Sequence, residues 1–215
     1  MDIFQRYKDA KNEEKAIQMA AYMKNHFLFL GIQKPERTIL NKEFIKEKKQ
    51  DVKIDWAFIE ECYKQPYREL HYLAITYLDA MKAKLNENDL LRVKWLITTN
   101  SWWDSVDAIN PIVGYLFLKF PNVKEEVETW IRAENIWLKR VSIICQLKFK
   151  EQTDTTFLAK AITSNTNTKE FFVNKAIGWA LREYSKTNKD WVIAFLEQHT
   201  LDKLSVREAS KYLSR

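Results

Sequence analysis

Apolar residues recur at intervals of three and four positions along nearly the whole chain, as they do on one face of an α-helix. Short polar stretches interrupt the pattern, often with proline or asparagine where a helix would begin, as at 34–35, 120–122 and 188–190. These breaks predict about a dozen helices. Only 3 Gly and 4 Pro occur in 215 residues, so turn-rich β folds lack their turn residues and we expect an all-α fold.

Four of the expected helices resemble one another at a nearly constant spacing. They start 36, 33 and 35 residues apart, and their sequences are YRELHYLAITYL from Tyr67, WDSVDAINPIVG from Trp103, IWLKRVSIICQL from Ile136 and FFVNKAIGWALR from Phe171. Each carries a polar residue at its fifth position: His71, Asp107, Arg140 and Lys175. Such a period predicts a HEAT-like helical-repeat solenoid, formed by residues 1–215 as a single domain. Asp107 and Arg140 would then be neighbours on one concave face.

Charge and composition narrow the classes of function. A net charge of +6 is compatible with a polyanionic partner, although most Lys and Arg on helices are simply solvated. Cys62 and Cys145 lie far apart in sequence and are typical of reduced core residues in a cytosolic protein. The chain has no apolar run of the roughly 20 residues that a membrane helix needs, and its first residues do not form a secretion signal. We expect a cytoplasmic protein.

No motif for a cofactor or metal is present. The chain has no glycine-rich phosphate loop and no metal-ligand spacing, and its three histidines are scattered: His26, His71 and His199. We therefore expect no cofactor and no metal. Any chemistry would depend on carboxylate, indole and basic side chains.

The stretch SWWDSVD, residues 101–107, combines two indoles with two carboxylates. Trp103 and Asp107 are spaced i, i+4 and would share a helix face, while Trp102 points about 100° away and fits the core. Asp104 lies elsewhere or caps the helix start alongside Ser101. An indole beside a carboxylate suits cation recognition. The cation could be a Lys or Arg of a partner protein, or a charge formed in a reaction.

A second informative stretch is KAIGWALREY, residues 175–184. Gly178 lies in the middle of a helix, where glycine costs roughly 1 kcal/mol against alanine, so close helix packing is expected there. Trp179 and Arg182 are spaced i, i+3 and share a face. They could be a packed indole with an arginine that extends to solvent, or a pair that stacks and binds phosphate.

Four ordered motifs carry a resemblance over nearly the whole chain: YMKNHFLFLGIQKPER (22–37), SWWDSVD (101–107), NIWLKR (135–140) and KAIGWALREY (175–184). They closely resemble the AlkD alkylpurine DNA glycosylases, bacterial repair enzymes built from HEAT-like repeats. The resemblance implies hydrolysis of the N-glycosidic bond of 3-methyladenine, 7-methylguanine and related cationic purines in double-stranded DNA. It also implies that the enzyme acts without flipping the base, unlike most enzymes that work on bases.

By the same resemblance, Asp107 is the catalytic aspartate, flanked by the active-site tryptophans Trp103 and Trp179. Arg140 matches the arginine that supports them and the DNA backbone. Tyr22 and Arg182 match positions on the DNA-facing surface. We expect a monomer without a protein partner. Two other classes stay open: a non-enzymatic HEAT-like scaffold that binds a peptide or nucleic acid in its groove, and a helical RNA-binding repeat protein.

Overall fold

The computed structural model describes residues 2–213, and within them it contains α-helices, short 3₁₀ turns and no strand. The only bridge between extended residues in this part of the chain joins Leu28 to Tyr67. The prediction of an all-α fold is confirmed. None of the described helices is long and apolar enough to cross a bilayer.

Contacts within the chain divide it into two compact units, Met1–Leu85 and Asn86–Arg215. The first unit contains five helices: α1 (Ile3–Asp9), α2 (Glu13–Tyr22), α3 (Lys34–Lys48), α4 (Trp56–Lys64) and α5 (Arg68–Met81). The second contains eight: α6 (Leu90–Thr98), α7 (Trp103–Lys119), α8 (Pro121–Trp130), α9 (Ile136–Ile144), α10 (Thr155–Thr163), α11 (Phe171–Tyr184), α12 (Lys189–Gln198) and α13 (Lys203–Ala209). That residues 1–215 act as a single domain stays a prediction.

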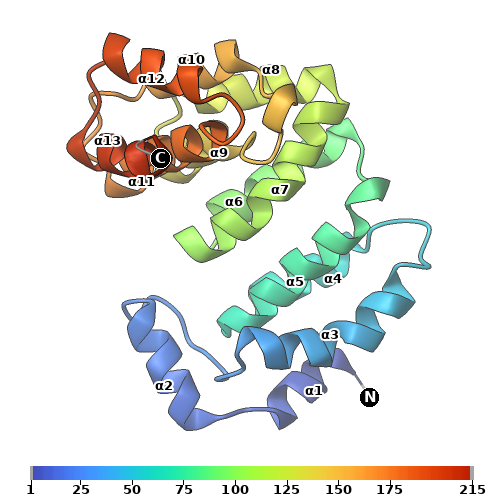
Figure 1. The fold of residues 1–215 in the computed structure, drawn as a ribbon. Helices are drawn as coiled ribbons and strands as arrows, with labels where there is room; N and C mark the ends of the chain where they lie inside the picture. Colours follow the sequence, from blue (N-terminus) through green and yellow to red (C-terminus); the bar gives the residue numbers. More distant parts are fainter. Residues whose placement is uncertain (1, 214–215) are drawn as a thin grey trace. The chain divides into compact units, whose positions relative to one another are not determined.

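The Asn86–Arg215 unit is a row of helical hairpins, which Figure 1 shows in green to red. α7 pairs with α8, α9 with α10 and α11 with α12, and the first helices α7, α9 and α11 pack side by side in chain order, followed by α13. The repeating segments begin where the sequence predicts. Their expected starts were 67, 103, 136 and 171, and the helices begin at Arg68, Trp103, Ile136 and Phe171.

Polar side chains connect successive repeats through the backbone. The Asn110 amide donates to the carbonyl of Ile144, and the Asn165 amide donates to that of Ile131, over 2.9 and 3.0 Å. The first helices α7, α9 and α11 also carry apolar residues that are fully buried, including Val106, Ile109, Val113, Val141, Val173 and Ala176. Each of these bonds joins two residues that are 34 positions apart, which is about one repeat. The bonds therefore help to fix the position of each repeat against the next.

In the Met1–Leu85 unit, a buried carboxylate organises the loop between α2 and α3. Glu69, on α5, accepts N–H bonds from Leu30, Gly31 and Ile32 over 2.9 to 3.1 Å. Gly31 has φ +87°, and a Cβ there would lie 2.0 Å from the carbonyl oxygen of Asn12, so only glycine fits. The packing of this loop within the unit therefore explains why the motif of residues 22–37 contains Gly31.

Candidate active site

Asp107 and Arg140 form a two-point ion pair in the Asn86–Arg215 unit. Nε and Nη2 of Arg140 each donate to one carboxylate oxygen of Asp107 over 2.8 Å. Nη1 donates to the main-chain carbonyl of Phe172 over 2.6 Å. The Arg140 side chain is 4% exposed, whereas that of Asp107 is 20% exposed. The carboxylate is therefore held from the protein interior and keeps part of its surface accessible.

This pairing follows from the repeat. Asp107 and Arg140 are the fifth residues of α7 and α9, which pack on each other. The Asn135 side chain accepts the N–H of Trp137 and defines the start of α9. The prediction that Asp107 and Arg140 are neighbours is confirmed.

An aromatic cluster joins the starts of α7, α9 and α11. Its members are Trp102, Trp137 and Phe172, with ring centroids 5.0 to 5.7 Å apart. Phe172 also supplies the carbonyl that Arg140 bonds, so the cluster helps to place one of the partners of the guanidinium. Trp102 thus packs against other aromatic rings, but it is half-buried rather than a core residue as we expected.

Trp103 is the first residue of α7 and lies on the same helix as Asp107, one turn earlier. It is half-buried, as is Asp104. The cap that we considered for Ser101 does not form. Trp102 occupies the N-cap position, and the Ser101 hydroxyl donates to the carbonyl of Ile97 at the end of α6.

Trp179 belongs to the same site as the ion pair. It lies half-buried on α11, and its ring centroid is 5.9 Å from Cζ of Arg140, within cation–π range. The structure therefore brings Asp107, Arg140 and Trp179 together. That Arg140 contacts a DNA phosphate stays a prediction. Three of its five N–H groups are already used, and the side chain is 4% exposed, so little of it is open to such a contact.

The other two predicted DNA contacts lie in different surroundings. Arg182 is on α11 near Trp179, and its Nη1 donates to Glu208 over 2.6 Å. Tyr22 ends α2 in the Met1–Leu85 unit, is 73% exposed, and lines a cavity of about 490 Å³ with Tyr72 and Arg37. Contact of either residue with DNA stays a prediction.

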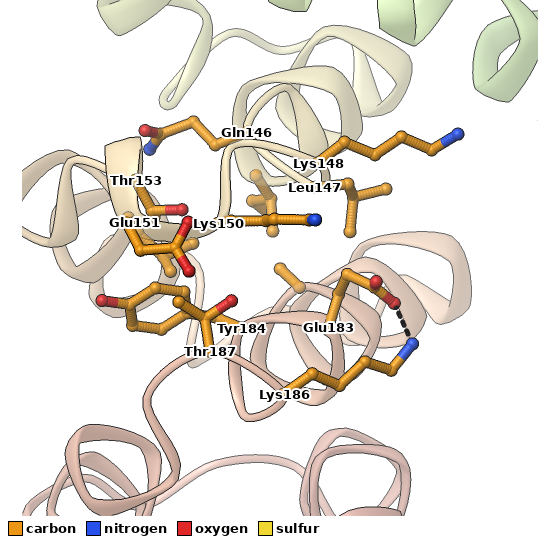
Figure 2. Close-up of a pocket in the computed structure, with 13 residues that line it drawn as sticks. Gln146, Leu147, Lys148, Lys150, Glu151, Thr153, Glu183, Tyr184, Lys186 and Thr187 are labelled. Atoms are coloured by element: carbon orange, nitrogen blue, oxygen red, sulfur yellow. Dashed lines mark hydrogen bonds and ion pairs between the residues drawn. The ribbon is translucent and has the colours of Figure 1, made fainter.

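A larger cavity of about 550 Å³ lies between the segment after α9 and the end of α11 (Figure 2). Lys148, Lys150 and Lys186 line it, and Lys186 pairs with Glu183 over 2.7 Å. None of the six predicted site residues lines this cavity. The ion pair of Asp107 therefore lies outside this cavity.

Sequence reasoning missed two parts of this region. The Phe172 carbonyl is a main-chain group, which side-chain motifs do not reveal. Glu208, on α13, accepts bonds from Lys175 and Arg182, and it lies 33 residues after Lys175. The same interval separates Asp107 from Arg140, so extending the repeat by one more unit could have found Glu208. Within residues 2–213, no group of three or more His, Cys, Asp or Glu side chains could hold a metal ion.

Comparison with known proteins identifies the family. The model of the family described as DNA alkylation repair enzyme matches residues 3–213, which include all six predicted site residues. This chain belongs to that family. The resemblance to bacterial DNA alkylation repair enzymes inferred from the four motifs is thereby confirmed.

Solved structures agree with the family and the fold. A protein described as a predicted DNA alkylation repair enzyme from Enterococcus faecalis is 38% identical with a TM-score of 0.86, covering 95% of this chain and 97% of that chain. AlkD2 from Streptococcus mutans is 16% identical with a TM-score of 0.59, covering 85% and 99%. The smu.31 protein from Streptococcus mutans UA159 is 15% identical with a TM-score of 0.60, covering 82% and 97%. The last two support the fold alone. No curated protein sequence matches the chain.

Proposed function

We propose that this DNA alkylation repair enzyme is a DNA glycosylase. It hydrolyses the N-glycosidic bond of purines alkylated at N3 or N7, such as 3-methyladenine and 7-methylguanine, in double-stranded DNA, and so initiates base excision repair. It works as a cytoplasmic bacterial monomer and does not flip the base. The observation that carries the proposal is the Asp107 carboxylate, which two N–H donors of a buried arginine hold at a partly exposed position.

The chemistry of the substrate explains why one fixed carboxylate is enough. An N3- or N7-alkylated purine is already a cation, so it departs as a neutral base and needs no proton from the protein. The cost of the reaction lies in the positive charge that develops on the deoxyribose. A carboxylate fixed in advance stabilises that charge without having to reorganise.

The two-point pairing leaves Asp107 able to act. Each carboxylate oxygen has two lone-pair positions, and Arg140 uses one on each oxygen. The remaining positions hold the attacking water and face the sugar. Arg140 thus orients Asp107. Binding of a backbone phosphate by its two remaining N–H groups would require the phosphate to reach a side chain that is 4% exposed.

The indoles complete the site. Trp103 and Trp179 flank the sugar, limit the access of water and attract the developing cation by roughly 0.5–2 kcal/mol. Two observations support these roles. Trp103 lies on the same helix as Asp107, and the ring of Trp179 lies against the Arg140 guanidinium. Tyr22 and Arg182 contact the DNA backbone, where most protein–DNA bonds are made.

The decisive experiment is single-turnover incubation with duplex DNA that contains 7-methylguanine. The proposal expects free 7-methylguanine and an abasic site that alkali cleaves. Binding to the duplex without release would favour a non-enzymatic HEAT-like scaffold. Tighter binding to single-stranded RNA than to the duplex would favour an RNA-binding repeat protein.

A further inference from the structure

Three cationic side chains converge on the carboxylate of Glu208. Nζ of Lys175 lies 2.7 Å from Oε1, while Nη1 of Arg182 and Nζ of Lys211 lie 2.6 and 2.8 Å from Oε2. The Glu208 side chain is 4% exposed, and the three cationic side chains are 22% to 47% exposed. The buried Glu208 carboxylate therefore pairs with three cationic side chains that are themselves partly exposed to solvent.

Two of these cations share a helix face with Trp179. Lys175, Trp179 and Arg182 follow one another on α11 at i, i+4 and i+7. Lys211 comes instead from the segment that carries Glu208, three residues later. The Glu208 carboxylate thus holds the cationic groups of Lys175 and Arg182 close together, on the face of α11 that carries Trp179.

Close packing of α11 on α13 puts Glu208 within reach of both cations (Figure 1). A Cβ on Gly178 would lie 2.5 Å from Cβ of Glu208 and 2.8 Å from the carbonyl oxygen of Ser205. The hydroxyl of Ser205 also donates to the carbonyl of Asn174 over 2.8 Å. Because the two helices are joined on both sides of Gly178, the Glu208 carboxylate has a defined place under α11.

Two of these cations, Lys175 and Lys211, also keep this carboxylate ionised. Bonds from Lys175 and then Lys211 lower the pKa of Glu208 from 4.5 to about 2, against the opposing effect of burial. Glu208 therefore carries its charge at every pH at which DNA repair is measured. The cluster has one anion and three cations, so its excess charge is positive.

We propose that Glu208 is a positioning residue, which holds Lys175 and Arg182 together beside Trp179 so that they bind one phosphate of the DNA backbone. This inference rests on the proposed function and names the side chains of the same site that bind a DNA phosphate. Without the carboxylate, the two cations repel each other and their flexible stems spread apart. Gathered in advance, they offer two charge-assisted donors to one phosphate at little further cost in entropy.

The test compares Glu208→Gln with Lys211→Met, which also removes one ion pair of Glu208 but leaves Lys175 and Arg182 held. With 7-methylguanine duplex at saturating enzyme, Glu208→Gln should slow excision about tenfold, because the nucleotide loses its position. Binding to unmodified duplex should weaken about threefold. Lys211→Met should leave both quantities near the parent values. Parent-like values for Glu208→Gln, or equal losses in the two variants, would overturn the inference.

A variant cycle separates positioning from a general structural role. In a chain that carries Lys175→Met and Arg182→Met, Glu208→Gln should change neither excision nor duplex binding any further, because its effect passes through the two cations. An undiminished effect in that background would also overturn the inference. If Glu208→Gln fails to fold by circular dichroism, Glu208→Asp replaces it. That change keeps the charge but withdraws the carboxylate by one methylene, and the same cycle applies.

The two proposals fail in different ways. If the unaltered protein releases no base, the glycosylase proposal fails. The test of Glu208 then loses its excision measurement but keeps its binding measurements. The binding measurements still decide the role of Glu208, because phosphate contact makes duplex affinity depend on salt. Removing Lys175 and Arg182 together should make the negative slope of log affinity against log salt shallower by about 0.9. An unchanged slope means that they bind no phosphate, and the inference is then wrong.

Discussion

Arg140 holds both carboxylate oxygens of Asp107 while its own side chain is almost completely buried. Removing one partner of a buried ion pair typically costs about 3–5 kcal/mol, because the other charge is left without compensation. The pair therefore matters for stability as well as for the position of the carboxylate. Activity measurements on variants of either residue need a melting curve beside them.

Replacement of Asp107 by Asn should lower the excision rate by roughly 10²–10³, since about 3–4 kcal/mol of electrostatic stabilisation is lost in the transition state. The free energy of unfolding should also fall, by about 1–3 kcal/mol rather than about 3–5 kcal/mol, because position 107 is partly exposed and the Asn oxygen can still accept one bond from Arg140. Affinity for unmodified duplex should stay equal or rise slightly, as one negative charge leaves the DNA-facing surface. Single-turnover release of 7-methylguanine well below the melting temperature measures the first effect.

The matched control is Asp104→Asn, which removes the same charge from the first turn of the same helix. It should excise at close to the parent rate, and loss of its helix-dipole contribution should cost about 0.3–1 kcal/mol. Parent-rate excision by Asp107→Asn together with a slow Asp104→Asn would show that the catalytic carboxylate is misassigned.

Substitutions of Arg140 distinguish orientation of Asp107 from contact with phosphate. Arg140→Lys keeps the charge but loses the two-point geometry, so excision should fall about tenfold. The salt dependence of duplex binding should stay as in the parent if Arg140 acts through Asp107. A negative slope of log affinity against log salt that is shallower by about 0.9 in Arg140→Met would instead indicate a lost phosphate contact.

Excision should require a base that already carries a positive charge. In the proposed mechanism no side chain protonates the leaving purine, so hypoxanthine and uracil should stay in duplex DNA under conditions that release 7-methylguanine. Chromatography of the released bases measures this. Clear release of either neutral base would mean that a general acid acts in the site.

Gly178→Ala should destabilise the protein, although alanine favours helix by about 1 kcal/mol at an unhindered position. The new Cβ would lie 2.5 Å from Cβ of Glu208 and 2.8 Å from a main-chain oxygen, so α13 must shift from α11. We expect a net loss of about 1–3 kcal/mol in the free energy of unfolding, measured by urea denaturation. A more stable variant would contradict this packing.

The stability of the protein at acid pH should depend in part on Glu208. Its pKa is lowered to about 2 in the folded protein, so its contribution is present above the unfolded value of 4.5 and is lost as the pH falls from there toward 2. Melting temperatures between pH 6 and pH 2.5 should fall less steeply for Glu208→Gln than for the parent. Parallel curves would mean that the carboxylate is not held in its charged form.

Local periodicity was enough to predict the helices and most of their faces. The starts of α7, α9 and α11 agree with the expected positions, because the apolar spacing within each segment is enough to locate its helix. The i, i+4 relation of Trp103 and Asp107 is likewise a property of one helix. The mid-helix glycine predicted a close approach, and α13 is what makes it. The sequence did not name that partner.

Contacts between helices decided the rest. Sequence spacing suggested that Asp107 and Arg140 are neighbours, but only packing shows that the arginine is buried, takes both oxygens and bonds the Phe172 carbonyl. The sequence did not reveal the role of Glu208 for the same reason, because two of its three partners, Lys175 and Arg182, lie on another helix. The sequence alone determined where helices begin and which side chains share a face, since both depend on the backbone's own period. The tertiary structure decided which charges meet and which are buried, since that depends on how helices far apart in the chain pack together.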